Sequence, residues 1–126
     1  MKHWLFLSVL MLCHSAHATS VWLNDWTSPE LQEAIAQGTR TILIPTAGTE
    51  QNGPYLPLGK HHFVVHEAAQ AIAKSLDKTL VAPILDYVPE GTISPPQGHM
   101  RFAGTLSLQE ATYEAVLEDT ARSFKQ

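Results

Sequence analysis

The sequence has little of several things, and each shortage excludes a class of protein. Its single cysteine, Cys13, lies near the N-terminus, so the rest of the chain can form neither an internal disulfide nor a thiolate zinc cage. Eight Lys and Arg residues stand against twelve Asp and Glu, for a net charge of −4. Such a chain has no basic patch to neutralise phosphates, which argues against nucleic-acid binding. Internal repeats and low-complexity tracts are also absent.

The one long apolar run is too short to span a membrane. It occupies residues 4–12, follows the basic Lys2 and precedes two alanines that flank a histidine. This order is typical of a secretory signal peptide over residues 1–18. We therefore expect export, a secreted or periplasmic location, and a mature domain over residues 19–126 that makes no contact with the membrane.

Hydrophobic periodicity in the mature part predicts alternating helices and strands. A helix capped by Ser28 should end before Gly38, and a second helix should run from about His61 to Lys78. Short apolar runs at residues 41–44 and 79–84 indicate buried strands. Residues 41–84 thus predict a strand–helix–strand unit with parallel strands, and the fold class is α/β.

A last helix is predicted after a long loop rich in glycine and proline at residues 87–104. Ser107 and Glu110 have the spacing of a capping box, and apolar residues continue at helical spacing to Phe124. No strand follows this helix, and two or three strands with three helices bury little apolar surface. We expect the chain to be the incomplete N-terminal half of a larger α/β domain, with marginal stability on its own.

Residues that can bind metals gather around the loop after the first strand. Glu50 lies in this loop and His61 at the start of the next helix, on the face turned toward the sheet. Open α/β sheets place ligands at the carboxyl ends of their strands, so both side chains can reach one divalent ion there. Each residue taken singly also has an ordinary interpretation, because loop glutamates and histidines at helix starts are usually solvated.

A second pair of histidines has a metal-compatible spacing on the same helix. His62 and His66 are four residues apart, but no carboxylate of the kind found in zinc-protease helices lies between them. We interpret this pair as a solvated or packing face.

Two stretches resemble the creatininase family. Residues 50–57 read EQNGPYLP, where the family has Glu-Gln-His-Gly-Pro-His-Leu-Pro, and residues 102–108 read FAGTLSL, where the family has Phe-Pro-Gly-Thr-x-Ser-Leu before a helix. The resemblance covers about residues 28–124. It implies a three-layer fold with a mostly parallel sheet. The Glu-Gln-Asn-Gly-Pro motif resembles that of an exported branch of the family.

The resemblance also implies a set of metal ligands. In the family, the Glu, the His two residues later and an Asp at the helix start bind two divalent ions that activate a bridging water. Carried over by position, Glu50 remains a ligand, Asn52 replaces the His and His61 replaces the Asp. Asn52 offers only a weak neutral oxygen, and His61 cannot bridge two ions. One or two ions of zinc or manganese are therefore implied, with His99 as a catalytic acid–base or substrate-side group.

The function that this resemblance implies is metal-dependent hydrolysis of amide or cyclic-amide C–N bonds in a small molecule. The full-length form would be a homo-oligomer, and this half alone would be inactive. The alternative is a non-catalytic exported protein that keeps the fold and binds a ligand or partner. Asn52, Tyr55 and the short length favour that alternative. A hydrolase should lose function with a chelator, whereas a binding protein should be indifferent to one.

Overall fold

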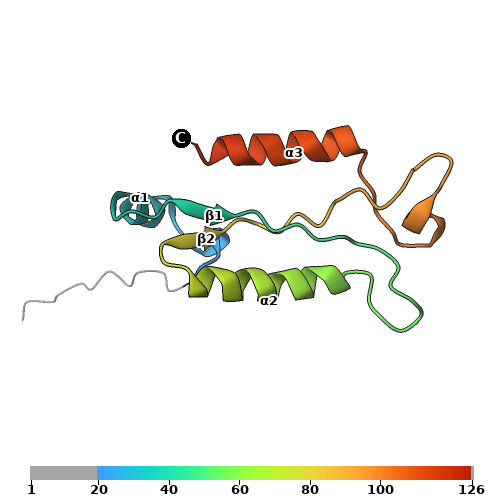
Figure 1. Ribbon diagram of the computed structural model, residues 1–126, viewed down its shortest axis with the longest axis horizontal. Coiled ribbons are helices and arrows are strands. Elements are labelled where there is room, and N and C mark those ends of the chain that lie inside the picture. The colour runs from blue at the N-terminus through green and yellow to red at the C-terminus, as the bar shows by residue number, and fades with distance from the viewer. Residues whose placement is uncertain (1–19, 126) are drawn as a thin grey trace, which may run out of the picture.

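A computed structural model describes residues 20–125, and the predicted signal peptide over residues 1–18 lies outside them. Figure 1 shows two helices on opposite sides of a central pair of strands, which gives three layers. The predicted α/β class is confirmed. Among residues 20–125, no helix combines the length and the apolar character that crossing a membrane requires. The elements, in chain order, are η1 (Leu23–Asp25), α1 (Ser28–Ala36), β1 (Thr41–Leu43), α2 (Lys60–Ser75), β2 (Thr79–Val81), η2 (Gly98–Arg101) and α3 (Glu110–Ser123).

The two strands are parallel, as the strand–helix–strand pattern predicted. Ile42 of β1 is in register with Leu80 of β2. β2 ends three residues before the predicted limit, because Pro83 has no N–H to donate to a ladder. The segments that follow the two strands pair again at an isolated parallel bridge between Thr46 and Leu85. This bridge carries both segments, side by side, toward the same end of the sheet.

The helix boundaries differ from the predicted ones for local reasons. The N-cap of α1 is Thr27 rather than Ser28, and its backbone N–H donates to the carboxylate of Glu30 at 2.8 Å in a capping box. α2 ends at Ser75 rather than Lys78. Leu76 is already extended there, and Lys78 has a left-handed backbone with a φ of 52°. The chain therefore turns into β2 earlier than periodicity alone indicates.

The core is small and lies between α2 and β2. Ala69 and Ala73 of α2 pack against Val81, which is fully buried. Val21, Trp22 and Leu43 cover this cluster and are themselves partly buried. α3 contributes no buried residue. Most of the apolar packing thus holds α2 to the sheet.

The capping box predicted at the start of α3 is wrong. The N-cap of α3 is Gln109, and no side chain caps the helix. The hydroxyl of Ser107 instead accepts the backbone N–H of Glu90 at 2.9 Å and donates to the carbonyl of Gly91 at 2.8 Å. Ser107 thus fastens the loop after β2 to the segment that enters α3.

Candidate metal centre

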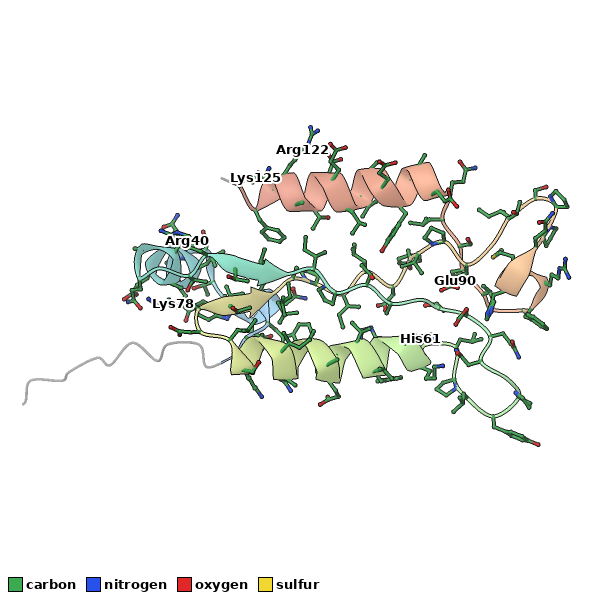
Figure 2. The ribbon with its side chains drawn as sticks, in the orientation of Figure 1. Arg40, His61, Lys78, Glu90, Arg122 and Lys125 are labelled. Carbon is green, nitrogen blue, oxygen red and sulfur yellow. The ribbon has the colours of Figure 1, made fainter. Side chains whose placement is uncertain are left out.

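The loops that leave β1 and β2 meet at the carboxyl end of the sheet. The N–H of Ala47 donates to the carbonyl of Leu85 at 2.8 Å, and the N–H of Leu85 donates to the carbonyl of Pro45 at 3.0 Å. A few residues beyond this ladder, each loop carries a glutamate: Glu50 on the first and Glu90 on the second. Figure 2 shows Glu90 and His61 at this end of the molecule.

Glu50 is more enclosed than the two histidines that it contacts. Its side chain is 12% exposed. Its Oε1 lies 2.8 Å from Nε2 of His61, in the first turn of α2, and its Oε2 lies 2.5 Å from Nδ1 of His99, in η2. The carboxylate thus draws together a loop, a helix start and a 3-10 turn. Glu50, His61 and His99 were all predicted site residues, and the structure brings them together.

Glu90 is the member of the cluster that the sequence analysis missed. Its carboxyl group hydrogen-bonds to the carboxylate of Glu50. One ligand atom each from Glu50, Glu90 and His99 lie within 4.8 Å of one another. The available signal was positional, because Glu90 follows the second parallel strand as Glu50 follows the first. Glu90 lies in a loop with no hydrophobic periodicity, so the pattern of the sequence did not single it out.

The backbone around Glu90 is shaped to bring its carboxyl group close to Glu50. A Cβ at Gly48 would lie 1.9 Å from Oε1 of Glu90, so only glycine leaves room for the carboxyl group there. Gly91 has a φ of 138°, and a Cβ on it would meet the carbonyl of Gln97 at 2.1 Å. The carbonyl of Glu90 accepts the N–H of His99 at 3.0 Å. The loop thereby fixes Glu90 and His99 relative to each other.

The two carboxyl groups have pKa values displaced in opposite directions. Burial, the hydrogen bond to Glu50 and the negative charge of Glu50 raise the pKa of Glu90. Burial also acts to raise the pKa of Glu50, but hydrogen bonds from Glu90 and His61 and the nearby charges of His99 and His61 lower it overall. Glu50 is therefore the more acidic of the two carboxyl groups, and Glu90 is the one that keeps its proton to higher pH.

Asn52 has a structural role in the same loop. Its side-chain amide nitrogen donates to the backbone carbonyl of Glu50 at 2.9 Å. The amide thereby stabilises the turn that presents Glu50. Asn52 was predicted as a third ligand, and the contact that its side chain makes is with the loop backbone.

The cluster borders a cavity of about 530 Å³ between α2 and the start of α3. Glu50, His61 and Glu90 line one part of it, while Glu110 and Tyr113 of α3 line another. A hollow of about 550 Å³ also lies between α1, β1 and the end of α3, but neither carboxylates nor histidines line it. Of these two hollows, only the cavity at the carboxyl end of the sheet is lined by groups that bind metal ions.

The donor set fits a divalent cation. Two carboxylates and two imidazoles are ligands that zinc and manganese both accept. Bonds of zinc to such ligands are about 2.0–2.2 Å long, so two ligand atoms on one ion lie roughly 3 Å apart. The 2.8 Å and 2.5 Å separations around Glu50 are hydrogen-bond distances, so these donors would move slightly apart to admit an ion. A cation would also replace the proton that joins Glu50 to Glu90 and relieve the repulsion between the two carboxylates.

The fold and the site together define an α/β protein with a carboxylate–imidazole centre at the ends of its parallel strands. Residues 24–126 match the family described as Creatininase, creatinine amidohydrolase, and the chain belongs to this family.

Two curated proteins that are similar to this chain are described as different enzymes. The mycofactocin precursor peptide peptidase of Mycobacterium tuberculosis (strain CDC 1551 / Oshkosh) is 30% identical over 92 residues, which are 66% of this chain and 34% of the relative. The 3-dehydro-scyllo-inosose hydrolase of Thermotoga maritima is 32% identical over 79 residues, which are 62% of this chain and 25% of the relative. The chain thus spans about a third or less of the length of these relatives.

Solved creatininase structures share the fold. A creatinine amidohydrolase superposes with a TM-score of 0.75 at 25% identity, over 86% of this chain and 41% of that one. A creatininase variant described as Zn-Zn type has a TM-score of 0.75 at 24% identity, and a structure named creatininase Mn has one of 0.74 at 24%. The chain corresponds to about two fifths of these structures.

Proposed function

We propose that the chain forms part of a metal-dependent hydrolase that cleaves an amide or cyclic-amide C–N bond in a small molecule. The observation that carries the proposal is the cluster of Glu50, Glu90 and His99 at the carboxyl end of a parallel sheet, with His61 beside it. Its support from relatives is the family match and the hydrolase and peptidase names among them.

In this proposal Glu50, Glu90, His61 and His99 would hold the cation. A divalent cation there would supply Lewis acidity toward a carbonyl oxygen and would make water a better nucleophile. Glu50 anchors the group because it is the lowered-pKa carboxylate and touches both histidines. The raised pKa of Glu90 means that a cation must compete with a proton for its carboxylate more than for an ordinary glutamate.

The far wall of the cavity would face the substrate. Tyr113 can donate a hydrogen bond from its hydroxyl to a carbonyl oxygen, and Glu110 can accept one from an amide N–H. These two groups from α3 would orient a small amide against the carboxylate–imidazole wall. His99 was expected as an acid–base group. Because it contacts Glu50, we also propose it as a metal ligand.

A non-catalytic binding protein on the same fold is the second candidate. Tyr55 is 94% exposed and Leu56 is 52% exposed, and both residues lie in the loop that carries Glu50. Exposed aromatic and apolar side chains on a loop are suited to contact a partner. Such a protein would keep its partner after treatment with a chelator.

The deciding experiment measures metal content and hydrolysis together. The purified chain is dialysed against Zn²⁺ or Mn²⁺ and analysed for bound metal, then assayed for ring opening of small cyclic amides beside a product extended by the downstream coding sequence. We expect the 126-residue chain to bind metal without turnover, and the longer product to be active and to lose activity with chelator. Turnover that resists the chelator, or no metal bound by either product, would refute the proposal.

We also propose export of the protein, supported by the basic, apolar and small-residue order of residues 1–18. N-terminal sequencing of the protein recovered from a periplasmic or culture fraction should begin at Thr19. Recovery of uncleaved chain from the cytoplasm alone would contradict export.

A further inference from the structure

A second group of nitrogen ligands lies on a different face of α2 from the carboxylate–imidazole centre. His62 and His66 occupy successive turns of this helix, and their rings lie 6.4 Å apart between centroids with planes at 22°. A pocket of about 390 Å³ lies against both rings. The rest of its lining comes from the segment before α1 and from the chain after β2: Trp22, Asn24, Asp25, Pro83 and Ile84. None of the residues in this pocket borders the cavity of Glu50 and Glu90.

Both histidines have a carboxylate on the same ring nitrogen. Nδ1 of His62 lies 2.9 Å from each carboxylate oxygen of Asp86, and Nδ1 of His66 lies 3.2 Å from Oε1 of Glu67. A neutral imidazole that donates from Nδ1 keeps its lone pair on Nε2. A carboxylate on the outer nitrogen is the arrangement that metal-binding histidines commonly have, since it fixes the tautomer and makes the ligating nitrogen more basic.

Trp22 holds one of the two rings in place. Its ring stacks on His66 with centroids 4.4 Å apart and planes at 12°. Asp86 restrains His62 through two equal contacts, so each ring has one fixed neighbour. Two nitrogens on one zinc ion must come within about 4.2 Å of each other, because each bond is about 2.1 Å long. The ring centroids are 6.4 Å apart, so binding of one ion would require rotation of the two side chains toward each other.

We propose that His62 and His66 bind a second divalent transition-metal ion through their Nε2 atoms. The class of ion is one that prefers imidazole, such as zinc, nickel or copper(II), rather than an oxygen-seeking ion such as manganese. Asp25 lines the same pocket, where its carboxylate accepts a hydrogen bond from the hydroxyl of Ser20 at 2.5 Å.

The test uses the full chain without a histidine tag and Zn²⁺ alone as the probe. Nitrogen-15 spectra of the histidine rings are recorded during titration, because the ring signals identify which nitrogen takes the metal. The Nε2 signals of His62 and His66 should shift together, in a step that Mn²⁺ does not produce. Nε2 signals of this pair that stay unchanged at saturating Zn²⁺ would overturn the proposal.

Two conservative variants separate binding from folding. His66→Phe keeps an aromatic ring to stack on Trp22, and His62→Asn keeps an N–H that can donate to Asp86, but neither offers the Nε2 lone pair. Each should weaken Zn²⁺ binding at this site at least tenfold, and Asp86→Asn should weaken it by roughly 10-fold. Retention of the full zinc affinity in both histidine variants, with unchanged unfolding temperature, would show that the pair only packs.

Discussion

Glu90 hydrogen-bonds to Glu50 across the two loops that follow the parallel strands. Of the two, Glu90 keeps its proton to higher pH, because burial and the hydrogen bond and charge of Glu50 raise its pKa, while the contacts of Glu50 with Glu90 and two histidines lower the pKa of Glu50. A cation at this centre would favour the ionised form of Glu90 over the protonated one. The contact therefore links metal binding at this centre to release of a proton.

Proton release is the first prediction. With the pKa of Glu90 raised, the metal-free protein keeps this proton at pH values where an ordinary Glu has lost it. Binding of Mn²⁺ must expel the proton, so affinity should rise with pH across the range in which Glu90 loses its proton. Calorimetry in two buffers of different ionisation enthalpy measures the number of protons released. Glu90→Gln should lose that component, and equal heats in both buffers for the wild type would contradict the assignment.

Ligand identity is the second prediction. Glu50→Ala removes the carboxylate that contacts both His61 and His99, and we expect Mn²⁺ affinity to fall by at least tenfold. His62→Asn is the matched control, because His62 pairs with Asp86 instead and should leave Mn²⁺ affinity within about twofold. Electron paramagnetic resonance of free Mn²⁺ gives both affinities. Similar losses in the two variants would show that the ligands are misassigned.

The role of Gly48 is the third prediction. Its backbone conformation suits alanine, but a Cβ there would lie 1.9 Å from the Glu90 carboxyl oxygen. Gly48→Ala should displace that carboxyl group and weaken Mn²⁺ binding about as much as loss of Glu90 itself. Gly59→Ala is the control, since nothing lies within 4 Å of a Cβ at that position. Unchanged binding in Gly48→Ala would mean that Glu90 is not needed where the structure places it.

The clamp made by Ser107 is the fourth prediction. Ser107→Ala removes the acceptor for the N–H of Glu90 and the donor to Gly91. An unpaired, part-buried N–H costs about 1–3 kcal/mol, so the free energy of unfolding should fall by that amount in urea titrations. Ser75→Ala, which loses only a bond to Ile72 within α2, should change stability by less than about 0.5 kcal/mol. Equal losses of unfolding free energy in the two variants would show that Ser107 does not act as a clamp.

Periodicity and loop chemistry were enough to predict the parallel unit and part of the site. Glu50 follows a strand and His61 begins a helix, so their approach could be inferred from topology alone. Glu90 could not, because its position depends on two glycines and on the Ser107 hydroxyl, none of which leaves a periodic signal. The same hydroxyl explains the wrong capping box, since a side chain can satisfy only one set of partners at a time.

The contacts made by the side of α2 that carries His62 also could not be predicted from the sequence. The spacing of His62 and His66 was visible, and the packing interpretation agrees with the stack of His66 on Trp22. Asp86, which contacts His62, is 24 residues away in sequence and comes near only because β2 returns beside β1. Tertiary pairing of this kind decides whether a histidine pair is a packing face, a ligand pair or both.

The most direct measurement of the central claim is anomalous diffraction from a crystal of the chain grown with Mn²⁺. We predict an anomalous peak within bonding distance of Glu50, Glu90 and His99, with His61 beside it. No peak should appear at the histidine pair of the second site, because that pair disfavours manganese. A peak elsewhere, or a metal-free Glu50–Glu90 pair at saturating Mn²⁺, would contradict the account.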